Sequence, residues 1–168
     1  MRIEIEPLLR RKYEGLTVHE IVVKNLVVRR EKQELEDFKK EMMDRIKRRY
    51  DLESLKDVEI IRKYRDFFWR LGIDPTKIRP ASEALIRRIL QGKRLPKINT
   101  AVDAYNLVSM ETHVAIGAFD ESLLQGRLRM RMAEEGEEFL GIGMREPKIL
   151  EGREIVISDE EELIAIYP

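Results

Sequence analysis

The sequence of 168 residues contains no cysteine and only two histidines, His19 and His113. The absence of cysteine excludes disulfide scaffolds, thiol catalysis and iron–sulfur clusters, and two isolated histidines disfavour the common zinc sites. We therefore expect no metal and no cofactor. Asparagine and glutamine together number six while glutamate reaches 23, a balance that is typical of proteins from hot environments.

Long uncharged runs are also missing. The longest is residues 112–119, far short of the roughly 20 apolar residues that a membrane helix needs. The N-terminal residues lack the apolar core of a signal peptide. These absences predict a soluble, cytoplasmic protein that has no membrane partner.

Charge is abundant but balanced, with 32 Lys and Arg against 32 Asp and Glu, so global basicity gives no argument for nucleic-acid binding. The balance does not hold locally. Residues 134–162 contain eleven acidic and three basic residues. Residues 77–97 hold one acid, Glu83, and seven bases: Lys77, Arg79, Arg87, Arg88, Lys93, Arg94 and Lys97. The basic segment either binds a phosphate backbone or pairs internally with the acidic half, and on charge alone the second is favoured.

Hydrophobic periodicity predicts an α+β fold. Apolar residues three and four apart predict helices near residues 31–50, 59–71, 81–91 and 100–111, the last with a capping box of Thr100 and Asp103. Alternation and β-branched residues predict strands at 1–7, 17–28, 113–119, 127–132, 154–158 and 162–167. With no linker or repeat, we expect a single domain over 1–168, with helices packed on a mixed, mostly antiparallel sheet from the C-terminal half.

Standard enzyme motifs are absent: the sequence has no phosphate-binding loop, no nucleophile elbow, no HExxH and no dinucleotide fingerprint. His113 is interpreted as a structural histidine because no second ligand or base accompanies it. Gly117, inside an apolar stretch, marks either a bulge or a place where a ligand approaches the backbone. No catalytic residue can be assigned from these patterns.

The order of several segments is more specific than any single motif. These are YRDFFWRLGIDPTKIRPASEALIRRIL, LPKINTAVDAYNLVSMET, AIGAFD, GRLRMRMAEEGEEF and EIVISD. Together they resemble the B-three/B-four aminoacyl-tRNA editing domain of the phenylalanyl-tRNA synthetase β subunit, over residues 64–168. The first sixty residues resemble those of free-standing versions of the domain.

The resemblance implies a pocket that hydrolyses the ester of a wrongly attached amino acid, tyrosine in the synthetase. It places Tyr105 where the family has threonine, keeps Asn106, and places Gly117 where the family has histidine. With Asn99 at the mouth of the same helix, the implied substrate pocket consists of Asn99, Tyr105, Asn106 and Gly117. The family's pocket glutamate lies beyond the final strand and has no counterpart before the sequence ends, so we expect either a truncated sequence or a missing acid.

Three functions stay open from the sequence. The first is a free-standing domain that binds tRNA or aminoacyl-tRNA through the basic segment and deacylates a mischarged tRNA in trans. The second is a non-catalytic module that binds tRNA or an amino acid. The third is a structural interaction protein, which the balanced charge and the long amphipathic helix favour.

Overall fold

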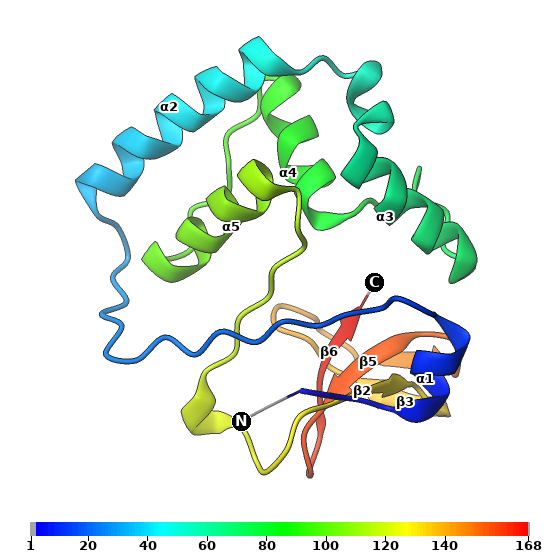
Figure 1. Cartoon of the computed structure of the whole chain (residues 1–168). Coiled ribbons are helices and arrows are strands. Elements are labelled where there is room, and N and C mark those ends of the chain that lie inside the picture. The colour runs from blue at the N-terminus through cyan, green and yellow to red at the C-terminus, as the bar shows by residue number, and fades with distance from the viewer. Residues whose placement is uncertain (1–2, 168) are drawn as a thin grey trace. The chain divides into compact units, whose positions relative to one another are not determined.

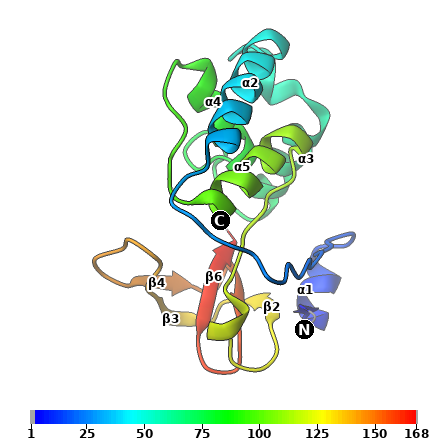
Figure 2. The same ribbon diagram turned by 90° about the vertical axis from the view of Figure 1, so that its left-hand side faces the viewer.

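The computed structural model describes residues 3–167 and divides the chain into two compact units. The helical unit is Asn25–Ala118, and the sheet unit combines Met1–Lys24 with Phe119–Pro168. Figures 1 and 2 show the helices of the first unit and the strands of the second from two directions. Each unit has its own hydrophobic cluster, so each is described by itself.

The helical unit contains four helices and one 3-10 turn: α2 (Gln33–Arg49), η1 (Ser54–Asp57), α3 (Glu59–Arg70), α4 (Ala81–Leu90) and α5 (Thr100–Thr112). All four predicted helices are therefore confirmed, with boundaries within two residues. Gly72 follows α3 with φ of +75°, and Gly92 follows α4 with φ of +74°. Both glycines adopt the left-handed conformation that commonly ends a helix.

The core of this unit is built from residues on all of its helices. Its buried members are Met42, Ile46, Leu55, Ile61, Ile86, Ile89, Leu107 and Met110. On α3 the buried residues are Ile61 and Phe68, whereas Ile60 and Trp69 are 40% and 57% exposed. The buried face of α3 therefore excludes Ile60 and Trp69.

The sheet unit contains a four-stranded sheet in the order β1-β2-β5-β6, formed by β1 (Glu4–Ile5), β2 (Arg129–Met132), β5 (Ile155–Ser158) and β6 (Leu163–Tyr167). Strand β1 pairs with β2 in parallel, and the other pairings are antiparallel. Helix α1 (Pro7–Lys12) follows β1, and η2 (Glu121–Leu123) precedes β2. The α+β class and the mixed, mostly antiparallel sheet are confirmed. The assignment of residues 1–168 to one editing-like domain stays a prediction.

Two predicted strands are wrong. Residues 17–28 and 113–119 form no strand, and the first of these segments exposes its apolar side chains, with Ile21 84% and Val27 69% exposed. β-branched residues favour a strand mainly by packing against cross-strand neighbours, which neither segment has here. A hairpin of β3 (Glu135–Phe139) and β4 (Lys148–Glu151) was not predicted, because its glutamate-rich first strand lacks the alternation of apolar and polar residues that indicates a strand.

Candidate nucleic-acid interface and substrate pocket

Asn99 caps the N-terminus of α5. Its side-chain Oδ1 accepts hydrogen bonds from the backbone N–H groups of Ala101 and Val102, at 3.0 and 2.9 Å. The predicted capping role of Thr100 is wrong, because Thr100 is already inside the helix and its Oγ1 accepts instead from the N–H of Arg29, at 2.9 Å. The side-chain NH2 group of Asn99 donates to no described residue, so it can still donate to a ligand.

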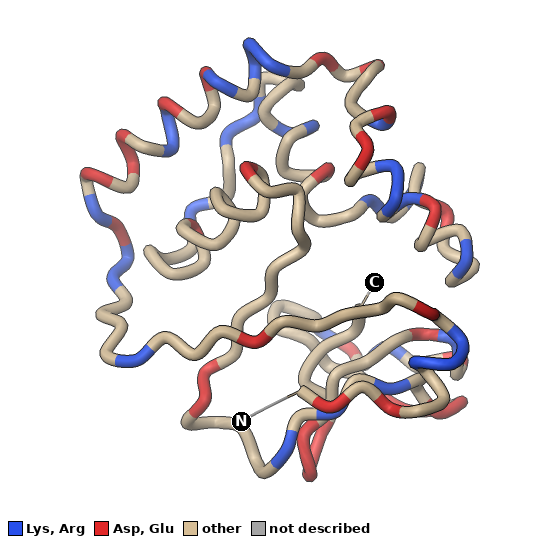
Figure 3. Tube along the Cα trace, in the orientation of Figure 1, with Lys and Arg blue, Asp and Glu red and all other residues tan. Residues whose placement is uncertain are grey.

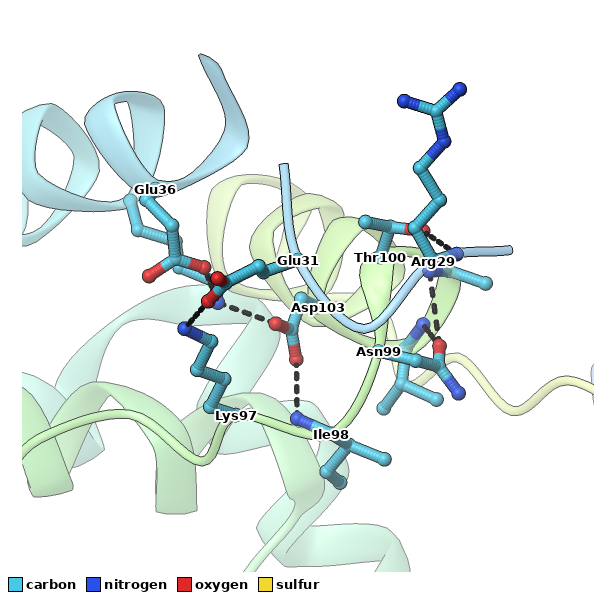
Figure 4. A network of polar contacts seen from close by, with 11 residues as sticks. Arg29, Glu31, Glu36, Lys97, Ile98, Asn99, Thr100 and Asp103 are labelled. Atoms are coloured by element: carbon cyan, nitrogen blue, oxygen red, sulfur yellow. Dashed lines mark hydrogen bonds and ion pairs between the residues drawn. The ribbon is translucent and has the colours of Figure 1, made fainter. Parts of the chain in front are cut away.

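A buried ion pair fixes this end of α5 to α2 (Figure 4). The Lys39 ammonium donates to Asp103 Oδ2 and to Glu36 Oε1, the latter at 2.8 Å, and Asp103 Oδ1 accepts from the N–H of Ile98 at 3.2 Å. The side chains of Lys39 and Asp103 are only 9% and 1% exposed. Burial alone would lower the pKa of Lys39, but the hydrogen bonds and charges of its two carboxylate partners outweigh burial and raise it.

The segment before α2 is fastened to the same place. The backbone N–H of Thr100 donates to the carbonyl oxygen of Arg29 at 2.8 Å, and Lys97 pairs with Glu31. Together with the ion pair of Lys39, these contacts hold residues 97–100 from two sides. The start of α5, where Asn99 lies, is therefore joined both to α2 and to the segment that precedes α2.

Tyr105 and Asn106 lie half-buried on α5, two turns beyond Asn99. Asn106 shares a helix face with Asn99, because seven residues make nearly two full turns. Burial, with the negative charge of Asp103, raises the pKa of Tyr105, so its hydroxyl is neutral and able to donate at neutral pH.

Gly117 is exposed in the segment that follows α5. A Cβ atom built on it would meet no atom within 4 Å. All four predicted pocket residues therefore belong to α5 and its flanking segments in the helical unit. That they enclose one ligand stays a prediction.

His113 ends α5 with φ of +60° and lies in the core, 5% exposed. Its Nε2 shares a hydrogen bond with the Tyr50 hydroxyl at 2.8 Å, and Ser82 Oγ donates to its carbonyl oxygen at 3.2 Å. Burial, and then the positive charge of Arg49, lowers the pKa of His113. These contacts join α4 and α5 to the end of α2, which is the structural role expected of this histidine.

The predicted basic segment is only partly neutralised. Arg87 Nε donates to Glu83 at 2.7 Å, and Arg65 also donates to this carboxylate at 3.0 Å. Glu83 is completely buried, and Lys97 is paired with Glu31. Arg88 Nε donates to the backbone carbonyl of Arg94 at 2.5 Å. The remaining members form no ion pair with a described residue and are exposed: Lys77, Arg79, Lys93 and Arg94.

The balanced total charge conceals two oppositely charged units. The helical unit holds 21 Lys and Arg against 15 Asp and Glu, a formal charge of +6, and the sheet unit holds 11 against 17, a formal charge of −6. Figure 3 shows acidic residues on the C-terminal strands and loops, and basic residues on α4 and, alternating with acidic ones, along α2. A polyanion would therefore be attracted to the helical unit.

A hollow of about 510 Å³ lies in the sheet unit, and none of the four predicted pocket residues lines it. Arg131 lies in its wall, held by two hydrogen bonds to Glu137 at 3.0 and 2.5 Å and by one to Ser158 at 3.3 Å. The hydrogen bonds from Arg131 lower the pKa of Glu137, so this pair is ionised and already satisfied. Most of the other lining side chains are carboxylates, and the described residues contain no group of three or more His, Asp or Glu able to hold a metal ion.

The fold and the site define an α+β protein with a basic helical unit and an acidic sheet unit. Residues 63–168 match the B3/4 domain family, and because this match spans more than half of the chain, the chain belongs to that family. The match begins within α3 and continues through α4, α5 and strands β2 to β6. The B-three/B-four resemblance found from the sequence is thereby confirmed.

Curated relatives carry the name phenylalanine–tRNA ligase beta subunit. The protein of Streptomyces avermitilis is 32% identical over 89 residues, which is 53% of this chain and 10% of the relative. That of Pseudomonas savastanoi is 34% identical over 88 residues, 52% of this chain and 11% of the relative. That of Fusobacterium nucleatum is 33% identical over 94 residues, 56% of this chain and 12% of the relative.

This chain thus spans about a tenth of the length of these relatives. No solved structure gives a significant match. None of the helices described within residues 3–167 is both long enough and apolar enough to span a membrane.

Proposed function

We propose that this chain binds tRNA and hydrolyses the ester of a mischarged aminoacyl-tRNA in trans. The observation that carries the proposal is the B3/4 domain match over residues 63–168, together with relatives named as phenylalanine–tRNA ligase beta subunits. The chain then acts as a second sieve, which removes amino acids that a synthetase attaches in error.

The charge of the helical unit supports RNA as the partner. Apart from Arg87 and Lys97, the bases of the 77–97 segment have no carboxylate partner that a phosphate would have to displace. Each phosphate that they neutralise releases counterions, which makes the affinity fall steeply with salt.

The α5 region supports an ester-binding pocket. Asn99 and Asn106 offer side-chain amide groups, and the neutral hydroxyl of Tyr105 offers a further donor. Such donors, aimed at the ester carbonyl, would stabilise the negative charge that develops when water adds to it. The bond between the acyl carbon and the ribose oxygen then breaks, the ribose oxygen takes a proton, and free amino acid and tRNA leave.

Two positions favour a change of specificity relative to the synthetase domain. Gly117 stands where the resemblance gives histidine, and the space beside its Cα is open. Tyr105 brings a ring where the resemblance gives a small threonine. We therefore expect an amino acid other than tyrosine, and these same two differences favour non-catalytic binding of tRNA or an amino acid as the second candidate function.

The test is a deacylation screen over mischarged, radiolabelled tRNAs, run beside filter retention of the same tRNAs. Release of amino acid from one or more of them supports the deacylase, and retention without release supports the binding module. Gly117→Val should abolish release while leaving the melting temperature unchanged, because a Cβ atom at this exposed position meets no atom within 4 Å.

The matched control is Ala118→Val, which places the same side chain at the next exposed position. Equal activity of the two variants would show that Gly117 does not line the pocket. Absence of both retention and release would contradict the proposed function as a whole.

A further inference from the structure

We infer that the ends of α2 and α4 form one phosphate-binding surface, so that Lys47 and Arg48, which lie outside the B3/4 match, contact tRNA. This inference rests on the proposed tRNA binding and names a second part of its interface. Some basic residues of the helical unit are already neutralised by carboxylates, and others are not.

Along α2, the cations that precede the last turn have carboxylate partners. Lys39 is paired with Glu36 and Asp103, and Lys40 pairs with Asp37 at 3.1 Å. Arg45 reaches Glu111 on α5 at 3.6 Å. The charge of most of the helix is therefore cancelled locally.

The last turn of α2 is different. It carries Lys47, Arg48 and Arg49 in succession, all exposed. Arg49 lies over the Tyr50 ring at 5.2 Å, whereas Lys47 and Arg48 form no ion pair with any described residue. Positive charge thus accumulates at this end of the helix.

Helix α4 repeats the pattern. Arg87 is neutralised by the buried Glu83, but Arg88, Lys93 and Arg94, at the end of the helix and just after it, have no carboxylate partner among residues 3–167. Both helices therefore leave their positive charge at the C-terminal end.

The two ends belong to one rigid surface. Tyr50 follows α2 directly, Leu90 closes α4 and Leu95 follows it, and all three pack against the same core. In both Figure 1 and Figure 2 the last turns of α2 and α4 lie toward the same end of the helical unit, and Figure 3 shows Lys and Arg on both. A phosphate backbone crossing this end would meet cations from both helices.

A competing explanation is that these cations only complement the helix dipoles, since positive charge in the last turn stabilises a helix by about 0.3–1 kcal/mol. The two explanations differ in what a charge reversal changes. If the cations only stabilise the helix dipoles, reversing their charge lowers the melting temperature and leaves the affinity for RNA unchanged. Loss of phosphate contacts lowers affinity and its dependence on salt.

The test measures binding of a deacylated tRNA transcript to the full chain over a series of salt concentrations. The α2 variant is Lys47→Glu with Arg48→Glu, and the α4 variant is Lys93→Glu with Arg94→Glu. The control, Lys40→Glu with Lys63→Glu, makes the same change of net charge at exposed lysines that are already paired with Asp37 and Glu59.

We expect both test variants to bind at least about tenfold more weakly at 0.1 M salt. We also expect slopes of log affinity against log salt that are shallower by about 1.4–1.8, the sum for two lost phosphate contacts. The control should show a much smaller change in both. If the α4 variant weakens binding but the α2 variant matches the control, the inference is wrong and the proposed function stands. If the unaltered chain binds no tRNA, both are wrong.

Discussion

The buried pair of Lys39 and Asp103 gives a sharp test of the structure, because it joins α2 to α5 across 64 positions of sequence. The perturbation is Asp103→Asn, which keeps the size of the side chain and an oxygen that can accept from the N–H of Ile98. It removes the negative charge and puts an NH2 donor in place of the oxygen that accepts from Lys39. Lys39 is then left nearly buried, with Glu36 as its one remaining carboxylate partner.

The expected loss of unfolding free energy follows from the burial of the pair. Removing one partner of a buried ion pair costs about 3–5 kcal/mol, since the other charge is left uncompensated. Glu36 still screens Lys39, so we expect about 3 kcal/mol for Asp103→Asn. The double variant Lys39→Met with Asp103→Leu leaves no buried charge, and it should be less destabilised than Asp103→Asn, losing mainly the acceptor for Ile98, at about 1–3 kcal/mol.

The assay is urea unfolding followed by circular dichroism at 222 nm, which reports chiefly on the helical unit because α2 to α5 lie there. A free-energy loss below about 1 kcal/mol for Asp103→Asn would refute the reasoning, as would a double variant that is less stable than the single one. The first result would mean that water reaches the pair. The second would mean that the pair stabilises the fold more than an apolar contact would.

Two further predictions concern buried ionisable groups of the helical unit. Glu83→Gln should destabilise the helical unit by about 3–5 kcal/mol, since the substitution leaves two arginines facing a neutral group. Arg87→Gln should cost less, because Arg65 still pairs with Glu83. Urea unfolding of the two variants checks this order of stabilities. The pKa of His113 is lowered from 6.5, so the unfolded state binds more protons below that pH and stability should fall between pH 7 and 5.5. His113→Asn, which tolerates the positive φ, should flatten the melting temperature over this range, and an unchanged slope would contradict the assignment.

Helices were predictable from the sequence because their signals are local. The three-and-four spacing of Met42, Ile46 and their neighbours describes one face of α2, and the glycines after α3 and α4 end those helices through their own backbone conformation. Strands depend on partners elsewhere in the chain. Residues 17–28 have the composition of a strand but no partner strand. Strand β3 pairs with β4, although its glutamate-rich composition is not typical of a strand.

The candidate site was likewise predictable where its signals are local, and not where they depend on the fold. The position of Asn99 at the start of α5 follows from local sequence, although its capping role was assigned to Thr100. The Glu83 to Arg87 pair has the i, i+4 spacing of a helical ion pair and could have been found. The pairing of Lys39 with Asp103 carries no such signal, because only the fold brings the two residues together.

The boundary of the family match does not coincide with the boundary of a folding unit. The match begins at residue 63, yet Met42 and Ile46 of α2 are almost fully buried in one cluster with Ile86 and Ile89 of α4. Without α2, the apolar face of α4 would be exposed to water, at a cost of about 25 cal/mol for each Å² of apolar surface uncovered, and Asp103 would lose its cation. Helix α2, which precedes the match, is therefore part of the unit that contains the candidate pocket residues, and its basic last turn is held in place by the same packing.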